Sequence, residues 1–289
     1  MKKLIKYVAK IILTTIVLSY FFDFLYTNAH HNKAPRSKIS WIKSTYFPDS
    51  LDYVLLGSSR CVHHLQPKII KEKTGKTGVN LGYAACGPVE IKLMLEEIIK
   101  KTKTKQAYIQ IGTKYNLEKP DNLAVVSWIP FIKDKHVYDE LIKYDSKYFH
   151  YKYIPFYRYQ KFDPKIGLRN ISLSYLGKEG NFINTSGYIP IRNTLKDDST
   201  FNYSMVKKEN PIINEIIKEC QKNNIELYFF TSPYHNSKVD FSFLNDYLPN
   251  YTDFSNTIAN QEMFSDLTHL NHKGSTSFTN IFTEKYFRQ

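Results

Sequence analysis

The chain has 289 residues, of which 42% are hydrophobic and 15% aromatic, which is ample material for the core of one large domain, alone or with a smaller companion. Its formal net charge of +13 is carried mostly by lysine, which indicates either an anionic partner or a lysine-rich solvated surface. Arginine is scarce and no nucleic-acid-reading motif occurs, so nucleic acid is not an expected partner.

Three widely spaced cysteines, Cys61, Cys86 and Cys220, form no CxxC pair. A zinc or redox motif is therefore not expected, and we interpret the three as small buried residues. His269 and His272 have a helical spacing that could bind zinc, but no third ligand with matching spacing accompanies them. The sequence thus predicts neither a metal site nor a cofactor.

Residues 1–30 predict a membrane anchor or a signal segment. Four lysines among the first ten residues precede or enter an apolar stretch that runs to Tyr26 and is about as long as a bilayer-spanning helix. Lysines before the span place the N-terminus in the cytoplasm and the remainder of the chain outside. Aromatic residues gather at the outer end, as they do at a membrane interface.

The alternative for this segment is a cleaved signal peptide, with Thr27-Asn28-Ala29 as a passable cleavage site. The protein would then be secreted or periplasmic. Under both interpretations the residues after about 30 work outside the cytoplasmic membrane. Residues 31–50 read as a polar linker.

Strand-like and helix-like segments then alternate, which predicts an α/β domain over residues 51–289 with a parallel sheet and helices on both faces. The expected strands are 52–56, 78–82, 107–111, 226–231 and 251–254, and the expected helices are 67–73, 88–101, 211–223 and 273–287. Residues from about 113 to 205 are rich in Tyr, Phe, Lys and Asn with weak periodicity, and we expect them to form an insertion or cap.

Candidate functional residues lie just past the expected strand ends. Ser59, Gly82, Gly112 and Ser232 each follow a strand, and functional groups of parallel sheets gather at that edge. Near the C-terminus, Asp266-Leu267-Thr268-His269 supplies a carboxylate and an imidazole three residues apart. A fold that joins the two ends of the domain would therefore assemble the three side chains of a serine hydrolase.

The ordered motifs Gly57-Ser58-Ser59, Asn80-Leu81-Gly82 and Asp266-x-x-His269 resemble the SGNH/GDSL hydrolase superfamily. The blocks LLGSSR, VNLGYAACGP, LYFFTSP and DLTHLNHKG are most similar to divergent, membrane-anchored members associated with bacterial cell-surface polysaccharides. The resemblance covers roughly residues 50–112 and 208–289. It implies a three-layer sandwich with a flavodoxin-like parallel sheet.

The resemblance also implies roles for individual residues. Ser59, third in Gly-x-Ser, matches the nucleophile, His269 the general base, and Asp266 the carboxylate that orients the base. The backbone N–H groups of Ser59 and Gly82 match two donors of the oxyanion hole. Arg60, Tyr83 and Tyr234 are candidate substrate-binding residues, although Arg60 could equally pair with an acid in a structural role.

The third family block departs from this pattern. Many members carry an asparagine there that supplies a side-chain oxyanion donor, whereas this chain has Gly112-Thr113-Lys114-Tyr115-Asn116 after the third strand. Asn116 comes two or more positions late, and Thr113 or Gln110 could substitute for it. The third donor is therefore left open.

The expected activity is that of an extracytoplasmic serine esterase or O-acyltransferase acting on acyl esters, acetyl above all, of cell-surface glycans. Its partners would be the glycan, the membrane and a membrane protein of polysaccharide biosynthesis. Taken singly, Ser59 and Asp266 could be capping residues and His269 a hydrogen-bonded core histidine. An inactive accessory subunit of polysaccharide assembly, favoured by the unclear third block, and a basic protein that binds acidic polymers are the alternatives.

Overall fold

The computed structural model describes residues 1–45, 47–162, 166–196 and 199–287, and the chain divides into two compact units. Unit 1 consists of Met1–Ser44 and Val125–Gly180, and unit 2 of Thr45–Ala124 and Asn181–Gln289. The two are described separately below.

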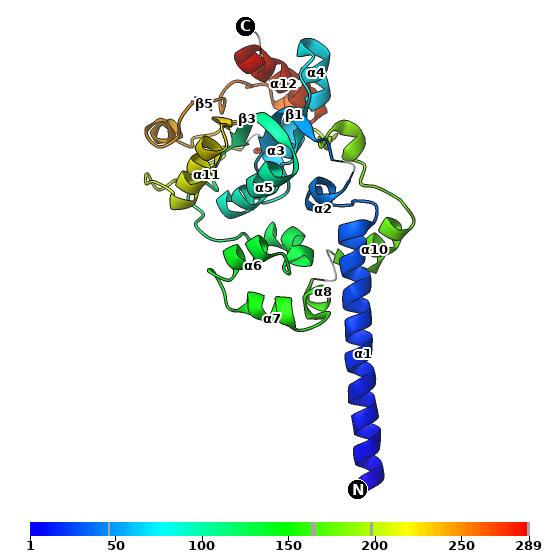
Figure 1. Cartoon of the computed structure of the whole chain (residues 1–289). Helices are drawn as coiled ribbons and strands as arrows, with labels where there is room; N and C mark the ends of the chain where they lie inside the picture. Colours follow the sequence, from blue (N-terminus) through cyan, green and yellow to red (C-terminus); the bar gives the residue numbers. More distant parts are fainter. Residues whose placement is uncertain (46, 163–165, 197–198, 288–289) are drawn as a thin grey trace. The chain divides into compact units, whose positions relative to one another are not determined.

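Unit 2 is built on a five-stranded sheet in which every pair of neighbouring strands is parallel (Figure 1). The strands are β1 (Ser50–Leu56), β2 (Gly78–Asn80), β3 (Lys103–Gln110), β4 (Glu226–Thr231) and β5 (Tyr251–Asp253), in the spatial order β2-β1-β3-β4-β5. The prediction of an α/β fold with a parallel sheet is thereby confirmed. The strands contain continuous apolar runs because helices cover both faces of a parallel sheet, so side chains on both faces are buried.

Helices pack on the two faces of this sheet. They are α3 (Ser59–His64), α4 (Pro67–Thr74), α5 (Pro88–Lys101), α11 (Pro211–Lys222) and α12 (His272–Phe287), with short 3-10 turns at Ile183–Thr185, Ser242–Asp246 and Gln261–Met263. Tyr53 and Tyr108 join a core with Phe278 and Phe282 of α12 on one face. Successive strand residues point to opposite faces, and Val54 is also fully buried, on the face covered by α5 and α11.

The strand register aligns the carboxyl ends of the central strands. Leu56, the last residue of β1, pairs with Ile109, and Gln110, the last residue of β3, pairs with Phe230. The segments that follow β1, β3 and β4 therefore start from one edge of the sheet, which is where a parallel sheet places its functional groups.

Unit 1 combines the N-terminal helix with short helices from the middle of the chain. Its elements are α1 (Lys2–Asn32), α2 (Lys38–Lys43), η1 (Val125–Phe131), α6 (Lys135–Leu141), α7 (Lys147–Tyr153), α8 (Tyr157–Lys161) and α10 (Leu168–Tyr175). Helix α1 is long and apolar enough to cross a membrane, and only Asp23, Tyr26 and Ala29 in it are buried.

Asp23 fixes the C-terminal third of α1 to the rest of unit 1. Its carboxylate forms an ion pair with Arg158, with Nη1 at 2.9 Å, and accepts hydrogen bonds from Lys133 Nζ at 2.7 Å and the Phe156 N–H at 3.0 Å. Arg158 is completely buried and also donates to the Thr27 hydroxyl. The buried guanidinium and the buried carboxylate compensate each other, so each depends on the other for its burial.

We expect Asp23→Ala to destabilise unit 1 by about 3–5 kcal/mol, because it leaves the Arg158 charge buried without a counter-ion. Amide hydrogen exchange of the full chain in detergent should show faster exchange in peptides from residues 125–162. Asp139, which pairs with Lys135 at the surface, is the matched control, since exposed pairs contribute about 1 kcal/mol or less. Equal protection in Asp23→Ala and Asp139→Ala would refute this role for Asp23.

Two segments differ from what their sequence indicated. The expected linker contains the end of α1 and helix α2, in which Trp41 and Ile42 are buried. Residues 125–180 of the expected insertion form one unit with the N-terminal helix, whereas residues 113–124 and 181–205 belong to the sheet-containing unit. The partners of Arg158 in α1, Asp23 and Thr27, lie more than 100 residues away in sequence, so no local pattern reveals this grouping.

Candidate active site

Ser59 stands at the first position of α3, directly after the turn that ends β1. Gly57 has φ of +142°, and a Cβ there would lie 2.7 Å from Cβ of Gln110, so the tight turn requires glycine. Ser58 is the N-cap of α3: its hydroxyl accepts from the Arg60 N–H at 3.3 Å and donates to Gln110 Oε1 at 2.7 Å. The turn therefore holds Ser59 at the edge of the sheet.

The second half of the site is the loop from Asp266 to His269. Oδ1 of Asp266 accepts hydrogen bonds from the backbone N–H groups of Thr268 and His269 at 2.8 and 2.9 Å, and from the Thr268 hydroxyl at 2.9 Å. These bonds close a turn that folds the imidazole back over the carboxylate. Oδ2 of Asp266 then lies 2.8 Å from His269 Nδ1.

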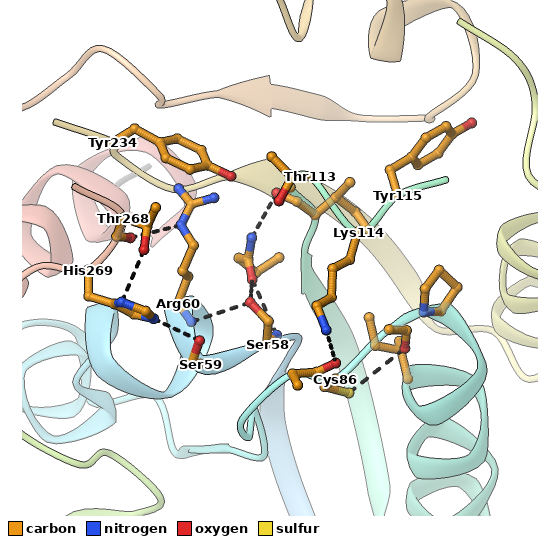
Figure 2. A pocket seen from close by; sticks show the side chains of 17 residues that line it. Ser58, Ser59, Arg60, Cys86, Thr113, Lys114, Tyr115, Tyr234, Thr268 and His269 are labelled. Atoms are coloured by element: carbon orange, nitrogen blue, oxygen red, sulfur yellow. Dashed lines mark hydrogen bonds between the residues drawn. The ribbon is translucent and has the colours of Figure 1, made fainter. Parts of the chain in front are cut away.

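The structure brings the two halves into contact. Nε2 of His269 lies 2.8 Å from Oγ of Ser59, although 210 residues separate them in the chain (Figure 2). The three side chains thus form a continuous hydrogen-bonded line from Ser59 through His269 to Asp266. The distance from Ser59 Oγ to His269 Nε2 and the distance from His269 Nδ1 to Asp266 Oδ2 are both within hydrogen-bond range. A base at the first distance can take up the proton of the nucleophile, and a carboxylate at the second can orient the base.

The hydrogen bonds and charges around Asp266 keep its carboxyl ionised, which favours the His269 tautomer that a general base requires. Burial of Asp266 alone would raise the pKa of its carboxyl, but the hydrogen bond and charge of His269 and the hydrogen bonds from Thr268 outweigh burial and hold that pKa well below its usual range. An ionised Asp266 accepts a hydrogen bond from the protonated Nδ1 of His269. Nε2 is then left unprotonated and accepts the hydroxyl proton of Ser59.

The side chain of His64 fixes the backbone directly after His269. The completely buried His64 accepts the Leu270 N–H at its Nε2, at 3.0 Å. Burial, with a smaller contribution from the charge of Arg60, lowers the pKa of His64 well below its usual value. A neutral His64 is what the accepted hydrogen bond needs, so the residue after His269 stays fixed at neutral pH.

A cavity of about 160 Å³ opens beside Ser59 and His269 (Figure 2). Its wall includes Cys86, Gln110, Thr113, Lys114 and Tyr234. Burial raises the pKa of the Cys86 thiol well above its usual value. Cys86 therefore stays protonated and does not compete with Ser59 as a nucleophile.

Arg60 also lines this cavity, and its hydrogen bonds connect three segments around the site. Its guanidinium stacks on the Tyr234 ring, 3.3 Å from the ring centroid, and Nε donates to the Thr268 carbonyl at 3.1 Å. Nη2 donates to the carbonyl groups of Ser232 and Pro233. The residue after Ser59 is thereby connected to the residue before His269 and to the end of β4.

We expect Arg60→Lys to lower stability by about 2 kcal/mol, because lysine keeps the charge but cannot reproduce the three carbonyl contacts and the stacking. Arg60 orients the loop that carries His269, so turnover should fall more than apparent substrate affinity. Thermal unfolding checks the first effect, and the activity assay given under the proposed function checks the second. A variant with normal turnover and a raised KM would instead indicate direct contact with substrate.

The other predicted site residues are placed as follows. The Ser59 N–H lies in the first turn of α3, where N–H groups have no acceptor within the helix, but the Gly82 N–H donates to Oδ1 of Asn80 at 3.1 Å. Asn116 does not line the cavity and exchanges hydrogen bonds with the Val206 backbone. Tyr234 lines the cavity, whereas Tyr83 does not. Gln110 and Thr113, the possible substitutes for the third donor, both do.

Sequence reasoning missed two contributors to this geometry, Thr268 and His64. Thr268 sits inside the recognised Asp-x-x-His spacing, and its side chain matters only once the turn has formed. His64 is next to His63 in sequence, and only the fold shows which of the two is buried. A search of protein-family models gives no match for this chain, and a search of curated proteins gives no significant match.

Proposed function

We propose that this protein is an extracytoplasmic serine esterase or O-acyltransferase of the SGNH type, acting on small acyl esters of cell-surface glycans. The observation that carries the proposal is the line Ser59–His269–Asp266, with 2.8 Å at both junctions. The strand order 2-1-3-4-5 is that of flavodoxin-like sheets. A nucleophile after β1, with base and acid after β5, agrees with the family resemblance.

The chemistry follows from the hydrogen bonds. As Ser59 Oγ attacks the acyl carbonyl, Nε2 of His269 takes the hydroxyl proton and Asp266 stabilises the imidazolium. The tetrahedral oxyanion would be stabilised by the Ser59 N–H and by groups of the cavity wall, each donor contributing about 3 kcal/mol. His269 then gives the proton to the leaving alkoxide, and the acyl group stays on Ser59.

Water or a sugar hydroxyl completes the cycle. His269 removes a proton from the acceptor, whose oxygen attacks the acyl-Ser59 carbonyl, and the proton returns to Ser59 as its oxygen leaves. Water as acceptor makes the protein an esterase, and a glycan hydroxyl makes it an acyltransferase. The same acyl-enzyme serves both reactions.

For the location we propose a retained membrane anchor with the N-terminus inside. Cleavage after Ala29 would remove Asp23, and the completely buried Arg158 would lose its counter-ion. This cost supports the anchor over the cleaved signal. A membrane-fraction protein that still contains residues 1–29, seen by mass spectrometry, is the expected result.

The activity is tested with the full chain in detergent and p-nitrophenyl acetate as substrate. We expect a burst of nitrophenol that approaches one equivalent per active protein, since the activated ester acylates Ser59 faster than the acyl-enzyme is hydrolysed and the acyl-enzyme accumulates. Addition of oligosaccharide acceptors should yield acetylated sugar if the protein is a transferase. A correctly folded protein that gives neither burst nor turnover would instead support the inactive accessory subunit.

A further inference from the structure

An exposed aromatic surface lies on α7 and the turn that leads into α8. Its exposed side chains are Phe149, Tyr153, Ile154 and Tyr157, with the half-buried Lys152 beside them; these five residues are called the α7–α8 surface below. Phe149 and Tyr153 are one helical turn apart, with 51% and 56% of their surface exposed and ring centroids 4.6 Å from each other. The mechanism proposed above makes no use of this surface.

The α7–α8 surface is held at a defined level of α1. The Phe156 ring packs against the rings of Phe22 and Tyr26, at 5.5 and 5.1 Å, and its N–H is bonded to Asp23. Arg158, which pairs with Asp23, also donates to the carbonyl of Tyr151 in α7. All of these residues belong to unit 1, so α7 and α8 are fixed to residues 22–27 of α1.

That level is where a membrane around α1 would end. Residues 4–22 are mostly apolar and exposed, with Lys6 and Lys10 in the N-terminal half and the small polar residues Thr14, Thr15 and Ser19 further along. At ~1.5 Å per residue they span roughly 28 Å, close to the ~30 Å hydrocarbon thickness of a bilayer, and lysines near the end of a span extend their charge to its interface. Within unit 1, α7 and α8 lie on the side from which the N-terminal part of α1 projects (Figure 1). The surface is therefore continuous with the apolar part of α1.

We propose that the α7–α8 surface is a second membrane contact, seated in the headgroup region of the bilayer that α1 spans. Aromatic rings with a polar edge and lysines with long apolar stems are the side chains that concentrate at this depth. Lys152, whose Nζ lies 3.7 Å from the centroid of the Tyr138 ring, supplies the charge that suits anionic headgroups. The inference rests on the membrane anchor proposed for α1.

A contact of this kind has a mechanical consequence. A single spanning helix leaves the attached unit free to tilt and rotate about one point. A second contact beside the exit of α1 would hold unit 1 in one orientation, with Asp23 and Arg158 as the rigid connection between helix and surface.

The test is depth-resolved fluorescence quenching of the full chain in nanodiscs of phosphatidylcholine and phosphatidylglycerol with brominated acyl chains. The native Trp41 and Trp128 are buried and give a constant background. Phe149→Trp reports on the α7–α8 surface, and Ile12→Trp on the middle of α1. The matched control is Leu176→Trp, an apolar site that is more exposed than Phe149, with 71% of its surface accessible. It lies two residues after Ser174, whose carbonyl accepts the Ala34 N–H, which places it roughly 15 Å further along the axis of α1.

We expect lipids brominated near the headgroup to quench Phe149→Trp several-fold more than Leu176→Trp, while deeply placed bromine quenches Ile12→Trp. Quenching at Ile12 with none at Phe149 would overturn the membrane contact and leave the anchor intact. Absence of quenching at both positions would overturn both. Equal quenching at Phe149 and Leu176 would also reject the proposal, because unit 1 would then have no preferred face towards the lipid.

Discussion

Substitution of Ser59 by alanine is expected to lower kcat for ester hydrolysis by roughly 10⁴- to 10⁶-fold and to abolish the burst. The proposed acyl-enzyme forms on Ser59 Oγ, which lies 2.8 Å from the base, and alanine has no atom to replace it. Fold and stability should change little, since within the described part of the chain the hydroxyl is hydrogen-bonded to His269 alone. Burst amplitude and steady-state rate on p-nitrophenyl acetate measure the effect.

Ser58→Ala is the matched control, because Ser58 is the adjacent serine and also lines the cavity. It removes the N-cap of α3 and the bond to Gln110, which should cost about 1 kcal/mol of stability. Its burst should persist. If Ser58→Ala lost the burst and Ser59→Ala kept it, the nucleophile would be Ser58 and the assignment of Ser59 would be wrong.

The second large effect is expected for Asp266→Asn, which should lower turnover by about 10⁴-fold. Asparagine keeps an oxygen that can accept the N–H groups of Thr268 and His269, so the turn is preserved. Its amide group, however, would donate towards Nδ1 of His269. The imidazole would then carry its proton on Nε2 and could no longer accept the proton of Ser59.

Thr268→Val separates this effect from general damage to the loop. It removes the hydroxyl that donates to Asp266 at 2.9 Å but leaves the carboxylate and its contact with His269. We expect a loss of activity of about tenfold at most, in line with one hydrogen bond. If Asp266→Asn loses no more activity than Thr268→Val, Asp266 has no orienting role.

The sheet and its main helices could be predicted because their signals are local. Residues 226–231 form the strand that was expected, and α5 begins at Pro88 and ends at Lys101 as its apolar spacing indicated. Helix α3 was not expected, since its six residues include two histidines and an arginine and carry no helical apolar pattern. It forms because the turn after β1 places Ser58 as its cap.

Unit 1 could not be foreseen for a different reason. Its short helices are stabilised by α1, through pairs such as Asp23 with Arg158 and Phe22 with Phe156, and weak local periodicity is the natural result. A charge within an apolar helix, as at Asp23, signals a buried partner but does not identify it.

The candidate site was partly predictable, because segments that directly follow the strands of a parallel sheet meet at the same edge of the sheet. Ser59, Asp266 and His269 were selected by spacing and strand context, and the structure places them in hydrogen-bond contact. Spacing cannot tell which way a side chain or an N–H group points. Gly82 and Asn116 were chosen as oxyanion donors on pattern alone. In the structure the Gly82 N–H is bonded to Asn80, and the Asn116 side chain is bonded to Val206.

The most direct test of the catalytic proposal is to map the residue labelled by a fluorophosphonate, a reagent that reacts with activated serines. The full chain in detergent is treated with the probe, digested and analysed by mass spectrometry. The account predicts one label on Ser59, present in Ser58→Ala and absent in His269→Ala. A folded wild-type protein that takes up no label, or takes it up on another residue, would contradict it.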